Sequence, residues 1–193
     1  MSLMGEADKE RANAHRMEPG SVISLLLEQH AKIRDTFGAV RAAPKDQRQE
    51  SFDQLRELLA VHEAGEEMVL RPVSRKDAGA QVADARNKEE DEAAHVLAEL
   101  EKMDASDERF MAKLADFELA VSAHADHEEL EEFPAVQSTH TVEELHALGD
   151  KLLAAERKAP THPHPTAAGS PAAQRVVGPF AALLDKARDA HKS

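Results

Sequence analysis

Two segments of the chain place a histidine four residues before a glutamate and end in a proline. His62 and Glu66 lie in the segment HEAGEEMVLRP, and His124 and Glu128 lie in the segment HADHEELEEFP. Residues four apart project from the same face of an α-helix, about one turn from each other. Each segment can therefore present an imidazole and a carboxylate together, which is a donor set that metal ions accept.

The neighbours of these pairs place them on the apolar side of their helices. Leu55 and Leu59 precede His62, and Val121 precedes His124, at spacings of three or four residues. This spacing is typical of the buried stripe of an amphipathic helix. Buried imidazoles and carboxylates without partners are costly, and metal ions would compensate that cost. A single His-x3-Glu pair is often only an exposed helix pair, but its duplication at matching places favours a metal site.

Two further helical segments each offer one histidine. His30 continues the apolar stripe that contains Leu27, and His95 lies beside Leu97. The candidate ligands are thus four imidazoles and two carboxylates: His30, His62, Glu66, His95, His124 and Glu128. Imidazole and carboxylate without thiolate suit iron, manganese or zinc. Two carboxylates among six ligands indicate two ions bridged by Glu66 and Glu128.

The elements that must position these ligands are four amphipathic helices. Ser21 is a plausible N-cap for the first, which Pro44 stops; Pro72 and Pro134 are expected to stop the second and the fourth. The expected ranges are about 21–43, 48–70, 81–103 and 108–133. Strand patterns are absent. Short connections between four helices predict an all-α fold, an antiparallel up-down four-helix bundle over residues 21–135.

The bundle is expected to carry flanking segments. Residues 1–20 are polar and predict an N-terminal tail, and residues 136–158 predict an additional helix. Residues 159–173 predict a Pro/His-rich linker, in which His162 and His164 alternate with prolines. Residues 174–193 predict a C-terminal amphipathic helix. The fold is therefore a bundle with additional C-terminal helices.

Composition excludes several classes of protein. The 193 residues carry 24 Lys+Arg against 37 Asp+Glu, a formal charge of −13, which disfavours nucleic acid and anionic membranes as partners. No apolar run approaches the roughly 20 residues of a membrane-spanning helix. Cysteine is absent, so disulfides and thiolate sites are excluded. A cytoplasmic protein is the default expectation. The glutamates at 67, 129, 131 and 132 are interpreted as a solvated acidic end, with a role in iron uptake as the weaker alternative.

The motifs HADHEELEEFP and LLEQHAKIRDTF resemble the hemerythrin-like HHE cation-binding family over roughly residues 20–135. The resemblance implies two non-heme iron ions joined by an oxo or hydroxo bridge. It implies as ligands the same six residues: His30, His62, Glu66, His95, His124 and Glu128.

The chain departs from the oxygen-carrying hemerythrins on the third and fourth helices. Those proteins have a histidine four residues before the third-helix ligand, where this chain has Asp91. Asp91 is a ligand, an outer partner or a solvated residue, and the sequence leaves the three open. His127 and Glu129 flank Glu128, and the sequence likewise leaves open whether either of them joins the metal site. The resemblance is thus to the bacterial hemerythrin-like branch and not to the respiratory carriers.

Six protein ligands shared by two irons leave positions open for a small molecule. We therefore expect a reaction with H2O2, NO or O2 in oxidative or nitrosative defence, such as catalase-like disproportionation of peroxide, with an electron donor that the sequence does not identify. The alternative is an O2, NO or iron sensor or store without turnover. A weaker alternative is di-iron oxidation of an organic substrate.

Overall fold

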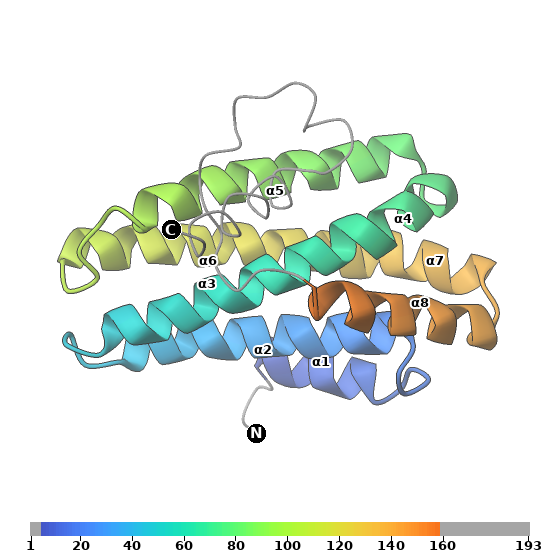
Figure 1. Cartoon of the computed structure of the whole chain (residues 1–193), viewed down its shortest axis with the longest axis horizontal. Coiled ribbons are helices and arrows are strands. Elements are labelled where there is room, and N and C mark those ends of the chain that lie inside the picture. Colours follow the sequence, from blue (N-terminus) through green and yellow to red (C-terminus); the bar gives the residue numbers. More distant parts are fainter. Residues whose placement is uncertain (1–4, 159–193) are drawn as a thin grey trace, which may run out of the picture.

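The computed structural model describes residues 5–158, and this part of the chain is helical throughout, without a strand. Four long rods run antiparallel to their chain neighbours (Figure 1). The first is α2 (Val22–Ala42), and the third is α5 (Ala80–Leu100). The second comprises α3 (Arg48–Gly65), η1 (Glu66–Leu70) and α4 (Arg71–Asp77), and the fourth comprises α6 (Glu108–His127), η2 (Glu128–Glu132) and α7 (Phe133–Thr139). The predicted all-α antiparallel bundle is confirmed.

The helix starts follow local capping chemistry. The side chain of Ser21 accepts a hydrogen bond from the backbone of Ser24, and Asp107 does the same for Arg109. Thr141 and Glu144 form a reciprocal capping box at the start of α8 (Val142–Glu156). These side chains satisfy backbone N–H groups that the first turn of a helix leaves unpaired.

The expectation that Pro72 and Pro134 stop their helices is wrong. At both places the rod continues through a π-turn, in which a backbone N–H bonds to a carbonyl five residues earlier: Arg71 to Glu66, and Phe133 to Glu128. Each proline then lies in the first turn of the next α-helix, where its missing N–H costs little. The two glutamates therefore lie inside continuous rods.

The N-terminal segment is also more structured than its polarity indicates. Helix α1 (Glu6–Ala14) packs along α2 (Figure 1). Glu10 and Ala14 are buried in this contact. Helix α1 is nearly all polar and lacks an apolar stripe, so periodicity alone could not predict it. The description of 1–20 as a tail does not hold for residues 6–14.

Helix α8 packs against α2, α3 and η1 (Figure 1). Gly149 permits this packing, because a Cβ there would lie 2.2 Å from the backbone oxygen of Gly20. The predicted linker 159–173 and terminal helix 174–193, with His162 and His164, lie outside the described residues.

Two apolar clusters fill the bundle, one toward each end. Phe37, Phe52, Phe110 and Phe117 belong to the first, which lies between α2, α3, α5 and α6. The second includes Leu26, Leu70, Phe133, Val136 and Leu152. Buried polar side chains separate the two clusters. Within residues 5–158, no helix has the length and apolar character to cross a membrane.

Candidate metal centre

Five of the six predicted ligands meet in the polar layer between the two clusters. His30 comes from α2, His62 and Glu66 from the second rod, and His124 and Glu128 from the fourth. All five are buried, and the carboxylates of Glu66 and Glu128 are fully inaccessible. Each of these two glutamates begins a π-turn, and their carboxylates approach each other within 4.8 Å.

Each of the three imidazoles points its Nε2 atom at a central carboxylate. The Nε2 atom of His30 lies 3.4 Å from Glu128 and 3.9 Å from Glu66. The Nε2 atom of His62 lies 3.4 Å from Glu66, and that of His124 lies 3.3 Å from Glu128. The nitrogen and oxygen donors therefore converge on a common interior.

The opposite nitrogen of each imidazole is held by a different outer residue. The Nδ1 atom of His30 is 2.9 Å from Glu129. That of His62 is 2.8 Å from the Gln29 side-chain oxygen.

The Nδ1 atom of His124 is 3.0 Å from Glu89, which also contacts His127. Hydrogen bonding at Nδ1 fixes the ring and its tautomer, and this pattern is nearly universal among metal-bound histidines. The three rings are therefore oriented as ligands before any metal arrives.

His95 does not join this group. Its side chain is 65% exposed, and its Nδ1 atom lies 2.7 Å from the backbone oxygen of Asp91. Asp91 is exposed as well, which favours the solvated alternative. The buried stripe of α5 contains Glu90, Ala93 and Leu97, and His95 is turned away from it. The predicted placement of His95 in the bundle interior is wrong.

The third helix instead contributes Glu90, which the sequence analysis missed. The Glu90 carboxylate is buried and lies 3.9 Å from Nε2 of His124. Glu63, one residue after His62, is buried beside it. The signal was present, because Glu90 lies three residues before Ala93 and seven before Leu97.

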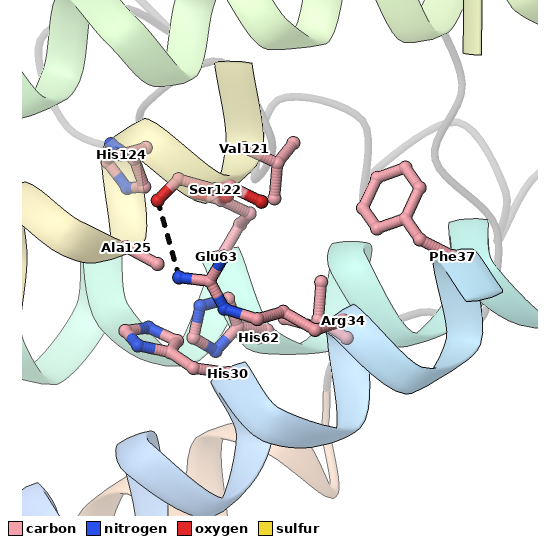
Figure 2. A pocket seen from close by; sticks show the side chains of 10 residues that line it. His30, Arg34, Phe37, His62, Glu63, Val121, Ser122, His124 and Ala125 are labelled. Carbon is pink, nitrogen blue, oxygen red and sulfur yellow. Dashed lines mark hydrogen bonds between the residues drawn. The ribbon is translucent and has the colours of Figure 1, made fainter. Parts of the chain in front are cut away.

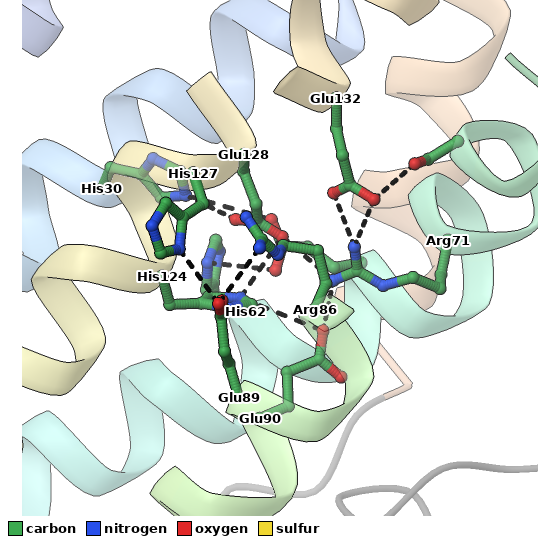
Figure 3. A network of polar contacts seen from close by, with 12 residues as sticks. His30, His62, Arg71, Arg86, Glu89, Glu90, His124, His127, Glu128 and Glu132 are labelled. Atoms are coloured by element: carbon green, nitrogen blue, oxygen red, sulfur yellow. Dashed lines mark hydrogen bonds and ion pairs between the residues drawn. The ribbon is translucent and has the colours of Figure 1, made fainter. Parts of the chain in front are cut away.

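Arg71 adds a buried cation to the layer (Figure 3). Its Nη2 atom donates to Glu90 and, at 2.9 Å, to Glu128. Its Nη1 atom donates to Glu132 at 2.7 Å, and the Ser74 hydroxyl donates to the same carboxylate. Glu132 is therefore a buried ion-pair partner, contrary to its interpretation as part of a solvated acidic end.

The charges of the layer shift its pKa values in opposite directions. Burial, followed by the nearby charge of Glu128, raises the pKa of Glu66 to about 8. Burial would also raise the pKa of Glu128, but His124, His30 and Arg71 outweigh it and hold that pKa well below its usual range. One central carboxyl is therefore ionised and the other keeps its proton at neutral pH.

The pKa values of the three imidazoles are also shifted in opposite directions. Burial and the nearby His30 lower the pKa of His62 to about 3, so this ring is neutral. Burial also disfavours charge on His30 and His124, yet Glu128 and neighbouring carboxylates outweigh it and raise both pKa values well above the usual range. Metal binding would have to displace these protons.

The donor atoms fall into two groups that fit metal ions. One atom from each of His30, His62, Glu66 and Glu128 lies within 4.8 Å of the others, and so does one from each of Glu63, Glu66, Glu90 and His124. Several of these atoms are buried and lack a hydrogen-bond partner, including both Glu66 oxygens and the Nε2 atoms of His30 and His124. Orphaned buried donors of this kind are rare in proteins, and coordination by a cation would satisfy them.

A small cavity adjoins the donors. Its volume is about 10 Å³, roughly that of one water molecule. Histidines 30, 62 and 124 and Glu63 line one side, and Phe37 and Val121 are among the residues of the other (Figure 2). Arg34 spans the mouth from α2 toward α6, where it donates to the Ser122 oxygen.

Arg34 also ties α1 to the bundle, because it contacts Glu10 and, at 2.7 Å, Asp126. Arg34→Ala leaves Glu10 buried without its cation, which is expected to weaken the docking of α1 by about 1.5–3 kcal/mol. Amide exchange over residues 6–14 should then accelerate by about tenfold or more. The control is Arg41→Ala, which removes an exposed ion pair with Glu118. Equal exchange in both variants would contradict the role of Arg34.

Comparison with known proteins agrees with this geometry. The family model of the hemerythrin HHE cation-binding domain matches residues 21–136, and the chain belongs to that family. It is 27% identical over 172 residues to an uncharacterised hemerythrin-like protein of Schizosaccharomyces pombe, covering 87% of this chain and 85% of that protein. It shares its fold with a Mycobacterium kansasii protein that contains a hemerythrin HHE cation-binding domain. That crystal structure matches with a TM-score of 0.66 and 24% identity, over 85% of this chain and 97% of the other.

Proposed function

We propose that the protein holds two non-heme iron ions and reacts with a small oxidant, H2O2, NO or O2. The observation that carries the proposal is the set of three anchored imidazoles whose Nε2 atoms face two buried carboxylates. Carboxylate and imidazole donors without thiolate suit iron, and the membership of the hemerythrin family supports this metal.

The two ions would occupy two positions that share a glutamate. The first position is formed by His30, His62, Glu66 and Glu128, and the second by Glu63, Glu66, Glu90 and His124. Glu66 belongs to both groups. Glu128 also lies 3.3 Å from His124. Glu66 and Glu128 would therefore bridge the two ions.

The size of the cavity favours a small reactant. A space of about 10 Å³ has room for about one water-sized molecule, which supports a reactant of that size. Apolar side chains on one side of the cavity would keep bulk water away from a bound molecule. Bound iron would supply the electrons that redox chemistry on such a molecule requires.

Glu63 belongs to the second metal position and also lines the cavity. Burial, followed by the charge of Glu90, raises its pKa well above the usual range. Its Oε2 atom has no hydrogen-bond partner. In the metal-free protein Glu63 therefore favours its protonated form, and an ion at the second position would displace that proton.

The test is iron content per chain together with the visible spectrum, before and after addition of H2O2. The chain has no Tyr or Trp, so the near-ultraviolet background is low and protein concentration must come from amino-acid analysis. Two irons per chain and O2 release without loss of protein would support turnover of peroxide. Iron loading without turnover would leave NO as the reactant to assay. A chain that binds no iron under anaerobic loading would contradict the proposal.

One observation favours a sensor as the second candidate. The side-chain oxygen of Gln29 accepts a hydrogen bond from Nδ1 of His62 at 2.8 Å, and its amide nitrogen donates to Glu156 at 2.6 Å. This chain of contacts connects a candidate ligand to the last turn of α8. A change at the centre could thus alter the packing of α8. Protease cleavage C-terminal to α8 that changes with the state of the iron would support this alternative.

A further inference from the structure

The internal repeat that supplies the two His-x3-Glu pairs is broken at an informative position. His62, Glu66 and Pro72 align with His124, Glu128 and Pro134, yet Arg71 aligns with Phe133. Both residues follow a π-turn and lie at its boundary with the next helix. The two halves of the centre therefore place an arginine and a phenylalanine at equivalent points of their rods.

These two residues contact different kinds of donor. Phe133 stacks on the ring of His30, with the ring centres 5.6 Å apart and the planes 19° from parallel. Arg71 instead donates to the carboxylate of Glu90. His30 on α2 and Glu90 on α5 are the single donors that the first and third rods contribute. One half of the centre thus pairs His30 with Phe133, whereas the other half pairs Glu90 with Arg71.

The two metal positions differ accordingly. The first position has two imidazoles and two carboxylates, and the second has one imidazole and three carboxylates. Buried atoms without a partner, Oε2 of Glu63 and Nε2 of His124, face the second position and indicate that it too accepts a cation. This second position, however, already has a cation nearby. Arg71 donates to Glu90 and to Oε1 of Glu128, the oxygen that lies 3.3 Å from Nε2 of His124.

We propose that the centre loads its two ions unequally, the first position before the second, because Arg71 holds the Glu90 carboxylate of the second position in the metal-free protein. This inference rests on the proposed two-ion centre and adds an order of loading to it. An ion at the second position must share or displace the hydrogen bonds of Arg71 and must also approach its positive charge. Arg71 competes less at the first position, because Glu128 faces His30 with its other oxygen, Oε2, which is buried and has no hydrogen-bond partner.

Titration of the metal-free protein with Mn²⁺ tests the inference without any assay of activity. Calorimetry gives the two dissociation constants, and electron paramagnetic resonance distinguishes an isolated Mn²⁺ from a spin-coupled pair. We expect two steps whose constants differ by about tenfold or more, the scale on which the partners of metal ligands alter affinity. The isolated signal should grow first and the coupled signal should replace it as the second ion binds.

Arg71→Gln removes the competing charge and keeps an amide donor. It is expected to strengthen the second step by about tenfold or more and to change the first step less. The matched control is Arg75→Gln on the same helix, since Arg75 forms only an exposed ion pair with Asp84. If Arg71→Gln does not fold, the triple variant Arg71→Phe/Glu90→His/Glu132→Leu serves in its place. It copies the pairing of Phe133 with His30 and removes the Glu132 carboxylate, which would otherwise lose its cation. The two dissociation constants of this variant should converge.

The outcomes separate this inference from the function on which it rests. Two Mn²⁺ bound by the unaltered protein with equal constants would overturn unequal loading and leave the two-ion centre standing. An Arg71→Gln variant that shifts both constants alike, or neither, would overturn it as well. A protein that binds neither Mn²⁺ nor Fe²⁺ would overturn the proposed function and this inference together.

Discussion

Glu66→Gln is expected to lower metal affinity by more than about 100-fold, because the lost carboxylate belongs to both metal positions. An amide is a weaker ligand than a carboxylate and carries no charge to offset that of the ions. The substitution should not disturb the fold. The pKa of Glu66 is raised to about 8, so the residue holds a proton at neutral pH in the metal-free protein, and glutamine reproduces that neutral form.

Metal per chain after gel filtration, measured by mass spectrometry, checks this prediction, with the melting temperature of the metal-free variant as a test of folding. His95→Asn is the matched control, because His95 has the residue type of a ligand but a side chain that is 65% exposed. It should load like the unaltered protein. If His95→Asn lost its metal while Glu66→Gln kept it, the site described above would be misassigned. His62→Ala should lose metal as Glu66→Gln does.

Five of the six candidate ligands could be placed from sequence because each continues an apolar stripe. Leu55, Leu59 and His62 follow one another at helical spacing, so burial of the leucines implies burial of the histidine. The same argument places His124 after Val121. The repeat then identifies Glu66 and Glu128, because each lies four residues after the histidine of its His-x3-Glu pair.

On α5 the apolar stripe does not identify the buried face, because that face is itself charged. Ala83, Arg86, Glu90, Ala93 and Leu97 form that face, and two of them are ionisable. A histidine was expected there, and His95 was the nearest. It lies two residues from Leu97, which turns it about 200° around the helix from that leucine. The buried Arg71 supplies a counterion for the carboxylate at position 90, and that contact joins two helices.

The two prolines show a second limit of local reasoning. A proline inside a regular α-helix removes a hydrogen bond and clashes with a carbonyl, so Pro72 and Pro134 predict helix ends. The π-turns before them relieve this conflict. Insertions of this kind frequently occur at functional sites. The recurrence of both features directly after Glu66 and Glu128 links the irregular backbone to the position of the ligands.

Metal affinity is expected to rise by about tenfold or more for each pH unit between about pH 6 and pH 8. The pKa of Glu66 is raised to about 8, and those of His30 and His124 are raised well above their usual range. Below these pKa values the groups hold protons that compete with the metal. A rise in pH removes the competitor, so binding becomes tighter until the pH passes the raised pKa values. His62 adds no dependence here, because its pKa is lowered to about 3.

Calorimetric titrations with Mn²⁺ in buffers of different ionisation enthalpy measure the protons released per ion. We expect about one to two, in agreement with the slope of affinity against pH. Glu66→Gln cannot serve as the control, since it removes a ligand. His127→Asn can, because His127 is partly exposed and contacts Glu89 but no candidate metal position. Its slope should equal that of the unaltered protein. An affinity that stays flat from pH 6 to pH 8 would mean that the donors are already deprotonated, and that carboxylate crowding does not hold protons in the centre.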